Sequence, residues 1–548
     1  MKILLAAVNA KYIHSCLAVY SLKAAAGVYG EHIAIGEYTI NQQTDEILRE
    51  LYKRQPQVVA FSCYIWNWRV IRELVRELPK VLPGVRLWVG GPEVSYNARE
   101  ILVEYPELTG VLRGEGEGTF LELAAYYIEG KGSLSLIRGL TFREQEGEIR
   151  ENTAAEPADM NRLPFVYEDM ELFRNRILYY ESSRGCPFRC SYCLSSIEKT
   201  VRCRSLALVK KDLGVFLEAK VPQVKFVDRT FNADSRRAAE LWKWILDNDN
   251  GVTNFHFEIG ADRITEEQLA ILSRMRPGLV QLEIGVQSTN PETIRAVSRR
   301  MDLEKLKETV ERIRGFRNIH QHLDLIAGLP GEDLESFRRS FDDVFALRPH
   351  NLQLGFLKVL KGSPMQQKAA EYGLVFHEQP PYEVLRTNWL AYGDILLLKG
   401  VEEMVEVYFN SRQFEKTLER LLCRYKSPFD FFHELAVYYE SRGYDKIHHS
   451  RIARYEILRE FLNRKNMLDP VYDQCMVYDL YAREMLKSRP PFAADRKPFR
   501  QKLREYERDY GKEVHVEVFL CEGEPQYVLF DYQRRDPLTR EAHVELLR

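Results

Sequence analysis

Three cysteines in one short segment, Cys186, Cys190 and Cys193, carry the clearest chemical signal in the sequence. Their spacing, CxxxCxxC, brings three thiolates to one locus, and thiolate is the soft ligand that iron–sulfur clusters prefer. Three protein ligands leave one iron of a four-iron cluster open to a substrate or a cofactor. The alternative is a structural zinc site completed by Cys203 or by a histidine. Zinc sites usually pair cysteines as CxxC twice, which this chain lacks, so the spacing favours the cluster.

The same segment resembles the cysteine motif of the radical S-adenosylmethionine (SAM) enzymes, which places an aromatic residue, here Tyr192, just before the last cysteine. The resemblance implies that the three cysteines hold a [4Fe-4S] cluster. It also implies that the amino and carboxyl groups of SAM chelate the fourth iron. Reductive cleavage of SAM would then release a 5'-deoxyadenosyl radical, which removes hydrogen from unactivated carbon, a task that requires a cofactor.

Length and composition indicate an ordinary globular protein of several domains. The chain has 548 residues, of which 45% are hydrophobic and 29% charged, with a net charge of -2. This balance gives no excess basic field, so neither nucleic acid nor a membrane surface is indicated as a partner. No apolar run is long enough to cross a bilayer, and nine cysteines without a disulfide framework fit a reducing compartment, so we expect a cytoplasmic protein.

The alternation of short apolar runs with amphipathic helical stretches predicts an α/β fold. In residues 1–150 it predicts a Rossmann-like domain with a doubly wound parallel sheet, closed by a hairpin at Leu140 to Arg150. A polar, proline-containing stretch marks residues 151–176 as a linker. The expected strands are Lys2 to Val8, Ile33 to Ile40, Val58 to Ser62, Arg86 to Gly90 and Gly110 to Leu112.

Residues 177–370 contain a second βα series, which predicts a partial (β/α)6 barrel that is open on one side. The cysteine segment follows its first strand, at the end where such barrels carry their chemistry. Residues 371–548 predict a mainly helical domain ending in a β-hairpin at Val514 to Tyr532. We expect this domain to cover the open side of the barrel or to shape the substrate pocket. The expected barrel strands are Tyr179 to Ser182, Val224 to Asp228, Asn254 to Gly260, Leu279 to Gln287, His320 to Gly328 and Asn351 to Val359.

Charged residues follow the second and third barrel strands, at positions that resemble SAM-binding positions of the radical SAM family. The resemblance implies that Asp228 accepts a hydrogen bond from the amino group of SAM. The chain departs from many relatives in having Arg229 where they carry a second acid. By the same resemblance, Glu258 binds the ribose hydroxyls and Arg263 pairs with the methionine carboxylate. Taken alone, each of these residues would more often be a helix cap or a solvated ion pair.

The fourth and fifth barrel strands end in glycine-containing turns that resemble cofactor-contacting turns of the same family. The first reads Gly285-Val286-Gln287-Ser288 and implies cofactor contacts from Gln287 and Ser288. The second reads Gly328-Leu329-Pro330-Gly331-Glu332 and implies contacts from Gly328 and Pro330. Glycine lets the backbone approach a ligand without an intervening Cβ, although either sequence could simply close a βα turn.

The first domain resembles the cobalamin-binding domains that precede many radical SAM enzymes. Its turns lie beyond the carboxyl ends of the strands, where doubly wound sheets bind ligands. The nearest resemblance is to the anaerobic magnesium-protoporphyrin IX monomethyl ester cyclase type, with an added C-terminal domain of unknown function. The alternative to a cobalamin-binding domain is a Rossmann-like domain that binds a nucleotide or binds nothing. The residues implied as cobalamin contacts are Ser62, Tyr64, Gly90, Gly91, Pro92, Gly114, Glu115 and Gly116.

One departure concerns the cobalt ligand. Domains that donate a histidine to cobalt carry DxHxxG after the first strand, whereas this chain has Asn9-Ala10-Lys11-Tyr12-Ile13-His14-Ser15, without the acid or the glycine. His14 is therefore read as a loop residue or a helix-cap neighbour. Any cobalamin is expected to bind without a histidine from this motif.

These features favour a cobalamin-dependent radical SAM C-methyltransferase. A radical cyclase or rearrangement enzyme with the same cofactors is the main alternative. A methylthiotransferase is disfavoured because it would need three N-terminal cysteines, and a noncatalytic cobalamin or redox sensor remains a further possibility. The expected partners are a small-molecule or peptide substrate and an electron donor such as flavodoxin or ferredoxin.

Overall fold

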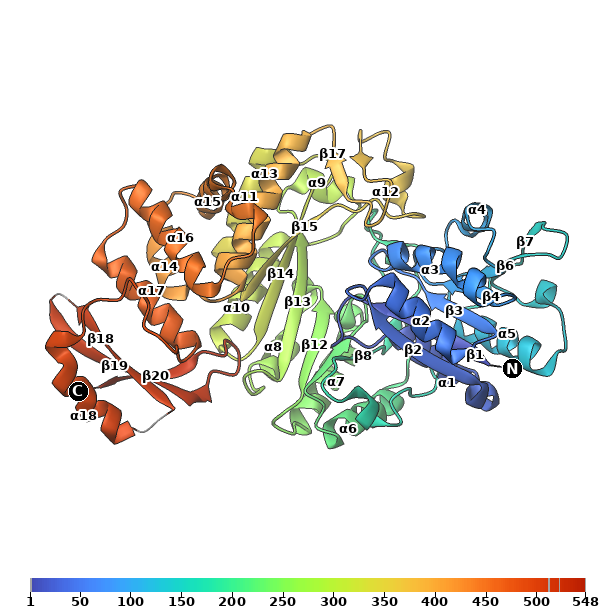
Figure 1. Ribbon diagram of the computed structural model, residues 1–548, viewed down its shortest axis with the longest axis horizontal. Coiled ribbons are helices and arrows are strands. Elements are labelled where there is room, and N and C mark those ends of the chain that lie inside the picture. The colour runs from blue at the N-terminus through green and yellow to red at the C-terminus, as the bar shows by residue number, and fades with distance from the viewer. Residues whose placement is uncertain (1, 511–512, 522, 548) are drawn as a thin grey trace.

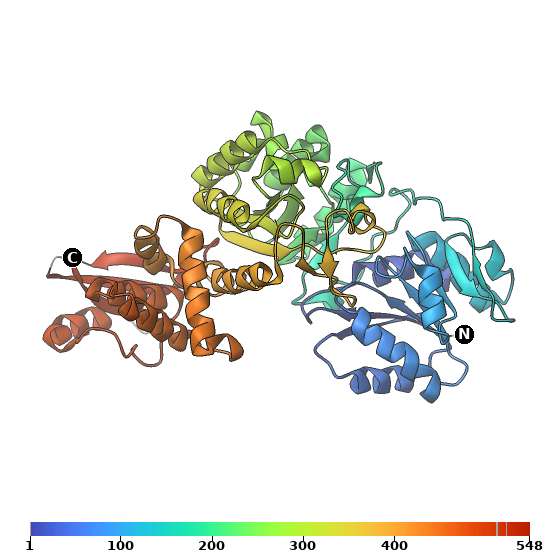
Figure 2. The same cartoon turned by 90° about the horizontal axis from the view of Figure 1, so that it is seen from above.

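The computed structural model describes residues 2–510, 513–521 and 523–547. The chain forms an N-terminal α/β domain, a central partial barrel and a C-terminal, mostly helical region. The N-terminal domain and the C-terminal region lie on opposite sides of the barrel in both views (Figures 1 and 2). This mixed α/β architecture confirms the fold class expected from the sequence.

The N-terminal domain is built on a seven-stranded sheet with the order β2-β1-β3-β4-β5-β6-β7. The first five strands pair in parallel, as the sequence predicts, and the last two form the expected antiparallel hairpin. The strands are β1 (Ile3–Asn9), β2 (Ile33–Thr39), β3 (Val58–Ser62), β4 (Arg86–Gly90), β5 (Gly110–Leu112), β6 (Leu140–Arg143) and β7 (Ile149–Glu151).

Helices cover both faces of this sheet. Within β1, Leu4, Ala6 and Val8 pack on one face, and the intervening residues pack on the other. A strand buried on both faces must be apolar throughout, which explains the continuous apolar run. One face carries α2 (Thr44–Arg54), α3 (Trp68–Val81) and α4 (Ala98–Glu104), and the other carries α1 (Leu17–Ala25) and α5 (Glu117–Glu129).

The central domain is a six-stranded parallel sheet with the order β15-β14-β13-β12-β11-β8. The first and last strands of the series are the two edges of this curved sheet, so the barrel is open between them, as expected. The strands are β8 (Leu178–Tyr180), β11 (Gln223–Phe226), β12 (Asn254–Ile259), β13 (Val280–Gln287), β14 (His320–Ala327) and β15 (Asn351–Phe356). The connecting helices are α6 (Leu206–Glu218), α7 (Ser235–Asp247), α8 (Glu266–Leu272), α9 (Pro291–Ala296), α10 (Leu303–Phe316) and α11 (Leu334–Ala346).

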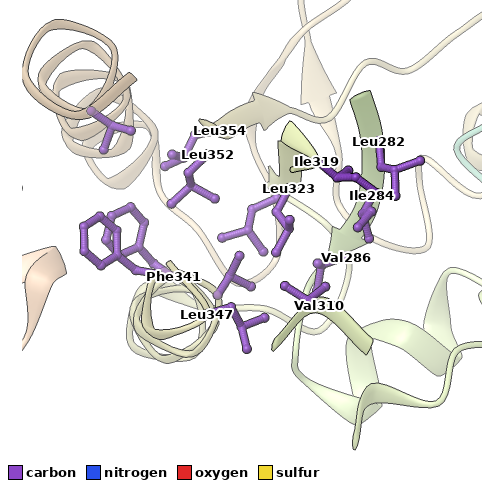
Figure 3. Packing of buried hydrophobic residues seen from close by; sticks show 14 of the residues in the cluster. Leu282, Ile284, Val286, Val310, Ile319, Leu323, Phe341, Leu347, Leu352 and Leu354 are labelled. Carbon is purple, nitrogen blue, oxygen red and sulfur yellow. The ribbon is translucent and has the colours of Figure 1, made fainter. Parts of the chain in front are cut away.

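Alternation along the barrel strands separates an apolar outer face from a polar inner face. In β13, Val280, Leu282, Ile284 and Val286 are buried, and the residues between them are only partly buried. Figure 3 shows Leu282, Ile284 and Val286 together with Val310 of α10 and Phe341 of α11 in one apolar layer. The inner face is thereby left for polar side chains.

The C-terminal region packs against the β15 edge of the barrel. The side chain of Asn410 donates to the carbonyl of Leu352 and accepts from its N–H, both at 2.9 Å, which satisfies backbone groups on that edge. Phe429 and Phe432 also pack edge-on against Phe341 of α11, so barrel and C-terminal helices share one core. These contacts place the region against β15 and α11, and its covering of the open side of the barrel stays a prediction.

The expected C-terminal hairpin is present, but a third strand joins it in an antiparallel sheet of order β18-β19-β20. The strands are β18 (Val514–Cys521), β19 (Glu524–Arg535) and β20 (Ala542–Leu547), and a short pair, β16 (Val375–Phe376) and β17 (Val384–Arg386), precedes the helices. The helices are α12 (Pro364–Gln367), α13 (Tyr392–Met404) with a π-helical extension over Val405–Asn410, α14 (Glu415–Leu422), α15 (Pro428–Arg442), α16 (Arg451–Arg464), α17 (Pro470–Arg483) and α18 (Arg500–Tyr510).

Across residues 2–510, 513–521 and 523–547, every helix is too short or too polar to span a bilayer.

Candidate functional site

The cysteine segment forms a closed loop on the barrel. Two short strands, β9 (Ser183–Arg184) and β10 (Arg202–Cys203), pair antiparallel and hold the two ends of residues 185–201 together. Gly185 has φ +92°, and a Cβ there would lie 2.2 Å from the carbonyl oxygen of Thr200. We call the paired strands β9 and β10 together with Gly185 the neck of the loop. The neck therefore requires glycine at this position. Cys203 lies on β10, outside the loop, and is exposed.

The three loop cysteines are free thiols near one another. Cys186 and Cys190 are buried, and Cys193 is partly buried. Burial raises the pKa of the Cys186 thiol, and the neighbouring Cys193 and Cys190 raise it further. A cluster or metal ion would stabilise the thiolates that this environment disfavours.

The donor set of the loop fits an iron–sulfur cluster by its chemistry. Thiolates are the soft ligands that such clusters prefer, and a four-iron cluster binds each thiolate through a different iron. Cys186, Cys190 and Cys193 would supply three of these ligands.

Two side chains that the sequence analysis missed contact this loop. Arg299, from the segment after α9, is partly buried with Nη1 3.8 Å from the Sγ of Cys190, and it donates to the carbonyl of Gly285. Thr230 lies 3.8 Å, Oγ1 to Sγ, from Cys186. Tyr192 lies beside Cys190 and Arg299, and its contact with a cofactor stays a prediction. Arg299 could not be found from spacing, because it lies over a hundred residues from Cys190 in the chain.

A cavity of about 710 Å³ lies between the N-terminal domain and the cysteine loop. One wall comes from turns at the carboxyl ends of β1, β3, β4 and β5, and the other from β8 and the cysteine loop. A ligand in it would touch both domains, and its volume lies in the range of small-molecule sites. The N-terminal domain supplies Asn9, His14, Tyr64, Trp66, Gly91, Pro92, Tyr96 and Gly114–Glu117, and the barrel supplies Tyr179, Glu181, Arg184, Leu194, Ile197, Glu198 and Arg229.

Most residues predicted as cobalamin contacts line this cavity. Tyr64 stacks on Trp66 with ring centroids 4.2 Å apart, which forms a flat aromatic wall. The lining set also contains Gly91, Pro92, Gly114, Glu115 and Gly116.

Ser62 and Gly90 belong to strand ends behind the lining residues and are not in the lining set. Gly91 is needed for packing, because a Cβ there would lie 2.6 Å from the carbonyl oxygen of Cys63. The carboxylate of Glu115 accepts hydrogen bonds from Arg184 and Arg202, so its observed partners are protein groups.

The carboxylate of Asp228 also accepts hydrogen bonds from protein groups. It is buried, and its carboxylate accepts from the Ser182 N–H at 2.9 Å and from the hydroxyls of Ser182 and Ser183 at 2.6 Å each. Burial raises its pKa, and these hydrogen bonds oppose the shift. Asp228 thus ties the second barrel strand to the segment leading into the cysteine loop.

Glu258 and Arg263 lie at the predicted end of the third strand. Burial raises the pKa of Glu258 to about 7, and nearby Glu283 raises it further. The Arg263 guanidinium lies 5.6 Å from the ring centroid of Phe188, within the cysteine loop. Arg263 therefore lies where a ligand of the loop could reach it, and Glu258 lies among the ionisable residues of the inner face, near Glu283 and Arg229.

The glycine turns of the fourth and fifth strands lie side by side. Ser288 is fully buried and donates to Glu332 at 2.6 Å, which links the two turns. Gly328 has φ +88° and packs against Val384, and Pro330 is buried beside it. Gln287 has φ +74°, a conformation that L-residues rarely adopt, which marks its turn as a constrained site.

The inner face of the barrel carries a set of ionisable residues that sequence reasoning largely missed. Glu283 accepts from Lys225 at 3.1 Å and lies 2.9 Å from His256, and His322 lies 3.1 Å from Asp324. The His256 and Lys225 neighbours hold the pKa of Glu283 at about 2, although burial acts in the opposite direction. The signal in the sequence is the alternation of polar residues with apolar ones in these strands.

His14 lines the cavity, and its Nδ1 lies 2.7 Å from the hydroxyl of Tyr179 on β8. Burial lowers its pKa, with a smaller effect from Lys11, so the neutral imidazole is favoured.

Comparisons with known proteins agree with this arrangement. A family model described as B12 binding domain matches residues 3–124, and one described as Radical SAM superfamily matches residues 180–344. A third, described as a protein of unknown function (DUF4080), matches residues 370–527. The chain carries a B12-binding domain followed by a radical SAM domain. This confirms the family resemblance seen in the sequence.

Individual relatives match this chain at low identity and over only part of their length. The cobalamin-dependent radical SAM methyltransferase TokK of Streptomyces tokunonensis is 25% identical over 353 residues, which cover 58% of this chain and 50% of TokK. The anaerobic magnesium-protoporphyrin IX monomethyl ester cyclase of Rubrivivax gelatinosus is 21% identical, with 58% of this chain and 59% of the cyclase covered. The match thus spans half of TokK and about three fifths of the cyclase.

One solved structure resembles the fold over nearly the whole chain. The cobalamin-dependent SAM radical enzyme OxsB, with aqua-cobalamin and SAM bound, has a TM-score of 0.60 at 15% identity, and the match covers 93% of this chain and 80% of OxsB. At this identity the likeness concerns the fold.

Proposed function

We propose that this protein is a cobalamin-dependent radical SAM enzyme, and specifically a C-methyltransferase acting on an unactivated carbon. The observation that carries the proposal is the cavity walled on one side by the B12-binding domain and on the other by the three-cysteine loop. A reaction needing both cofactors requires them to face a common space.

The residues present fit all three groups. Cys186, Cys190 and Cys193 would hold a [4Fe-4S] cluster, and the Tyr64–Trp66 wall with the glycine turns would hold the corrin. Glu258, Gln287 and Arg263 would orient SAM from the barrel side, with Arg299 close to the cluster. When bound, these groups supply SAM cleavage and methyl transfer, and the protein supplies position and the exclusion of water.

We further propose that cobalamin binds without a histidine ligand from the chain. The hydrogen bond between His14 Nδ1 and Tyr179 is compatible with a positioning role for His14 in the cavity wall. Replacing His14 with alanine should then leave the absorption spectrum of bound cobalamin unchanged. A shifted spectrum in the His14→Ala protein would show that the imidazole reaches cobalt.

Two relatives favour two different reactions on the substrate. The match to TokK favours methyl transfer, and the match to the Rubrivivax cyclase, which covers an equal share of this chain, supports oxidative cyclisation as the second candidate. Both would use the cofactor arrangement described above.

A substrate-independent experiment separates these candidates. Reconstituted, cobalamin-loaded and reduced protein is incubated with SAM, and the nucleoside products are measured by mass spectrometry. A methyltransferase should form S-adenosylhomocysteine as well as 5'-deoxyadenosine, because it consumes SAM both as methyl donor and as radical source. Formation of 5'-deoxyadenosine alone would favour the cyclase, and formation of neither would refute both. The Cys190→Ala protein is the matched control for 5'-deoxyadenosine.

The unassigned partners follow from the same chemistry. We propose a low-potential electron donor such as flavodoxin or ferredoxin, and a small-molecule or peptide substrate. The eight cysteines whose surroundings are described are all free thiols, which suits a reducing, cytoplasmic setting. Loss of SAM-dependent activity in air, and its retention under anaerobic conditions, would test this setting.

A further inference from the structure

The neck of the cysteine loop carries two arginines side by side. Strands β9 and β10 pair so that Arg184 is opposite Arg202, and the loop between them holds all three cysteines. Two cations at adjacent positions repel one another unless anions lie between them. Glu181 and Glu198 supply anions from the same domain, and two further carboxylates come from the other domain.

Both arginines bind the turn between β5 and α5 of the B12-binding domain. Arg184 donates from Nη2 to Glu117 at 2.5 Å and from Nη1 to Glu115 at 3.0 Å, and its Nε donates to Glu181 at 2.8 Å. Arg202 donates to the other oxygen of Glu115. Glu115 therefore bridges both strands of the neck, and Glu117 adds a second contact to Arg184.

This network is shielded from water. The side chain of Arg184 is 13% exposed and that of Glu117 is 9% exposed, whereas a surface pair such as Lys53–Glu50 is 61% and 44% exposed. Exposed pairs contribute little, but removing one partner of a buried pair leaves an uncompensated charge. The backbone N–H of Ala158 also donates to Glu115 at 2.8 Å, which fixes the carboxylate on a second side.

The same turn forms part of the cavity wall. Gly114 and Gly116 flank Glu115 and line the cavity, and Gly185 next to Arg184 lines it from the loop side. The ion pairs thus directly connect the wall that would face cobalamin with the loop that would carry the cluster.

We propose that Glu115 and Glu117, with Arg184 and Arg202, form an electrostatic latch that fixes the cysteine loop against the B12-binding domain and so sets the separation of the two cofactors. The four are positioning residues and take no part in the chemistry. The role of the latch in cofactor separation rests on the proposed function, whereas its hold on the loop does not.

The first test uses the cofactor-free full chain. Trypsin can cut after the exposed Arg189 and Lys199, both inside the loop, and in a folded chain its rate follows the fraction of molecules with the loop open. The Glu115→Gln/Glu117→Gln protein keeps the shape of both side chains and should be cut at these sites at least about tenfold faster. The control, Glu46→Gln/Glu122→Gln, changes two exposed glutamates of the same domain and should be cut at the wild-type rate.

An unchanged cleavage rate in the Glu115→Gln/Glu117→Gln protein would overturn the latch. If that protein fails to fold, Arg202→Gln removes the less buried half of the network and should show a smaller acceleration at the same two sites. An unchanged rate in Arg202→Gln would then overturn the proposal.

The second test uses protein loaded with cluster and cobalamin. The reduced cluster and cobalt(II) are both paramagnetic, so their dipolar interaction in electron paramagnetic resonance reports their separation. We expect one defined coupling in the wild type and a weaker, broader one in the Glu115→Gln/Glu117→Gln protein. Faster cleavage with an unchanged coupling would show that the latch holds the loop without setting the separation. Failure of the wild type to bind cobalamin would refute the proposed function and leave the cleavage test to decide the latch.

Discussion

Glu332 illustrates how a single buried carboxyl group joins two turns of the barrel. It is fully buried, and one oxygen accepts hydrogen bonds from Ser288 at 2.6 Å and Ser340 at 2.9 Å. The other oxygen has no hydrogen-bond partner among the residues that the structure describes. Burial raises the pKa of this carboxyl group to about 7, so the protonated form is favoured in the folded protein.

This gives a pH prediction with a defined sign. The folded protein binds the proton of Glu332 more tightly than the unfolded chain, so stability is lost as the pH rises from about 5 through 7. The Glu332→Gln protein lacks this titration and, relative to wild type, should gain about 2–3 kcal/mol in free energy of unfolding between pH 5 and pH 8. Urea unfolding at both pH values measures the difference, with the exposed Glu267→Gln change as control. A wild-type–variant difference that is the same at both pH values would contradict this assignment.

At this scale, the sequence predicted the positions of reactive residues better than their partners. Cys186, Cys190 and Cys193 could be grouped because their ligand geometry is local in the chain. The roles of Asp228 and Glu115 could not be read in the same way, since their donors, Ser182 and Arg184, come from other elements. Arg299 was missed because a charge after a helix has no distinctive spacing.

Among the elements, the paired strands β9 and β10 are the smallest and bear most directly on the site. Their closure places residues 185–201 as one loop, and it depends on the close approach of Gly185 to Thr200. Alanine at Gly185 would meet the Thr200 carbonyl and would also strain a left-handed backbone.

We therefore expect the Gly185→Ala protein to incorporate much less iron on anaerobic reconstitution and to unfold at a lower temperature. The control is Gly214→Ala in α6, where a Cβ meets no atom within 4 Å. That change should stabilise the helix by about 0.5–1 kcal/mol and leave iron content unchanged. Wild-type iron content in the Gly185→Ala protein would show that the neck does not hold the cysteines.

Strands buried on both faces were predicted at nearly their observed bounds, because their apolar runs are continuous. The C-terminal strand β20 was not predicted, since the burial of its residues does not alternate regularly and only Ala542 and Leu547 at its two ends are buried. Its pairing with β19 is set by tertiary contact, which periodicity alone does not report.

In the whole molecule, the three parts are joined by specific polar contacts as well as by apolar packing. The latch joins the B12-binding domain to the cysteine loop. A second contact joins the B12-binding domain to the segment after β15. Buried Glu93 of that domain accepts a hydrogen bond from Tyr382 and lies 3.5 Å from Lys361. The order of domains could be predicted from motifs, but these contacts could not, because they join residues far apart in the sequence.

The central claim is that three cysteines hold a cluster whose fourth iron is free for SAM. The most direct measurement is electron paramagnetic resonance of the anaerobically reconstituted, reduced protein, with metal content, before and after addition of SAM. The account predicts about four irons per chain bound through the loop and a spectrum that changes when SAM is added. Zinc in the loop, or a cluster spectrum unaffected by SAM, would contradict it.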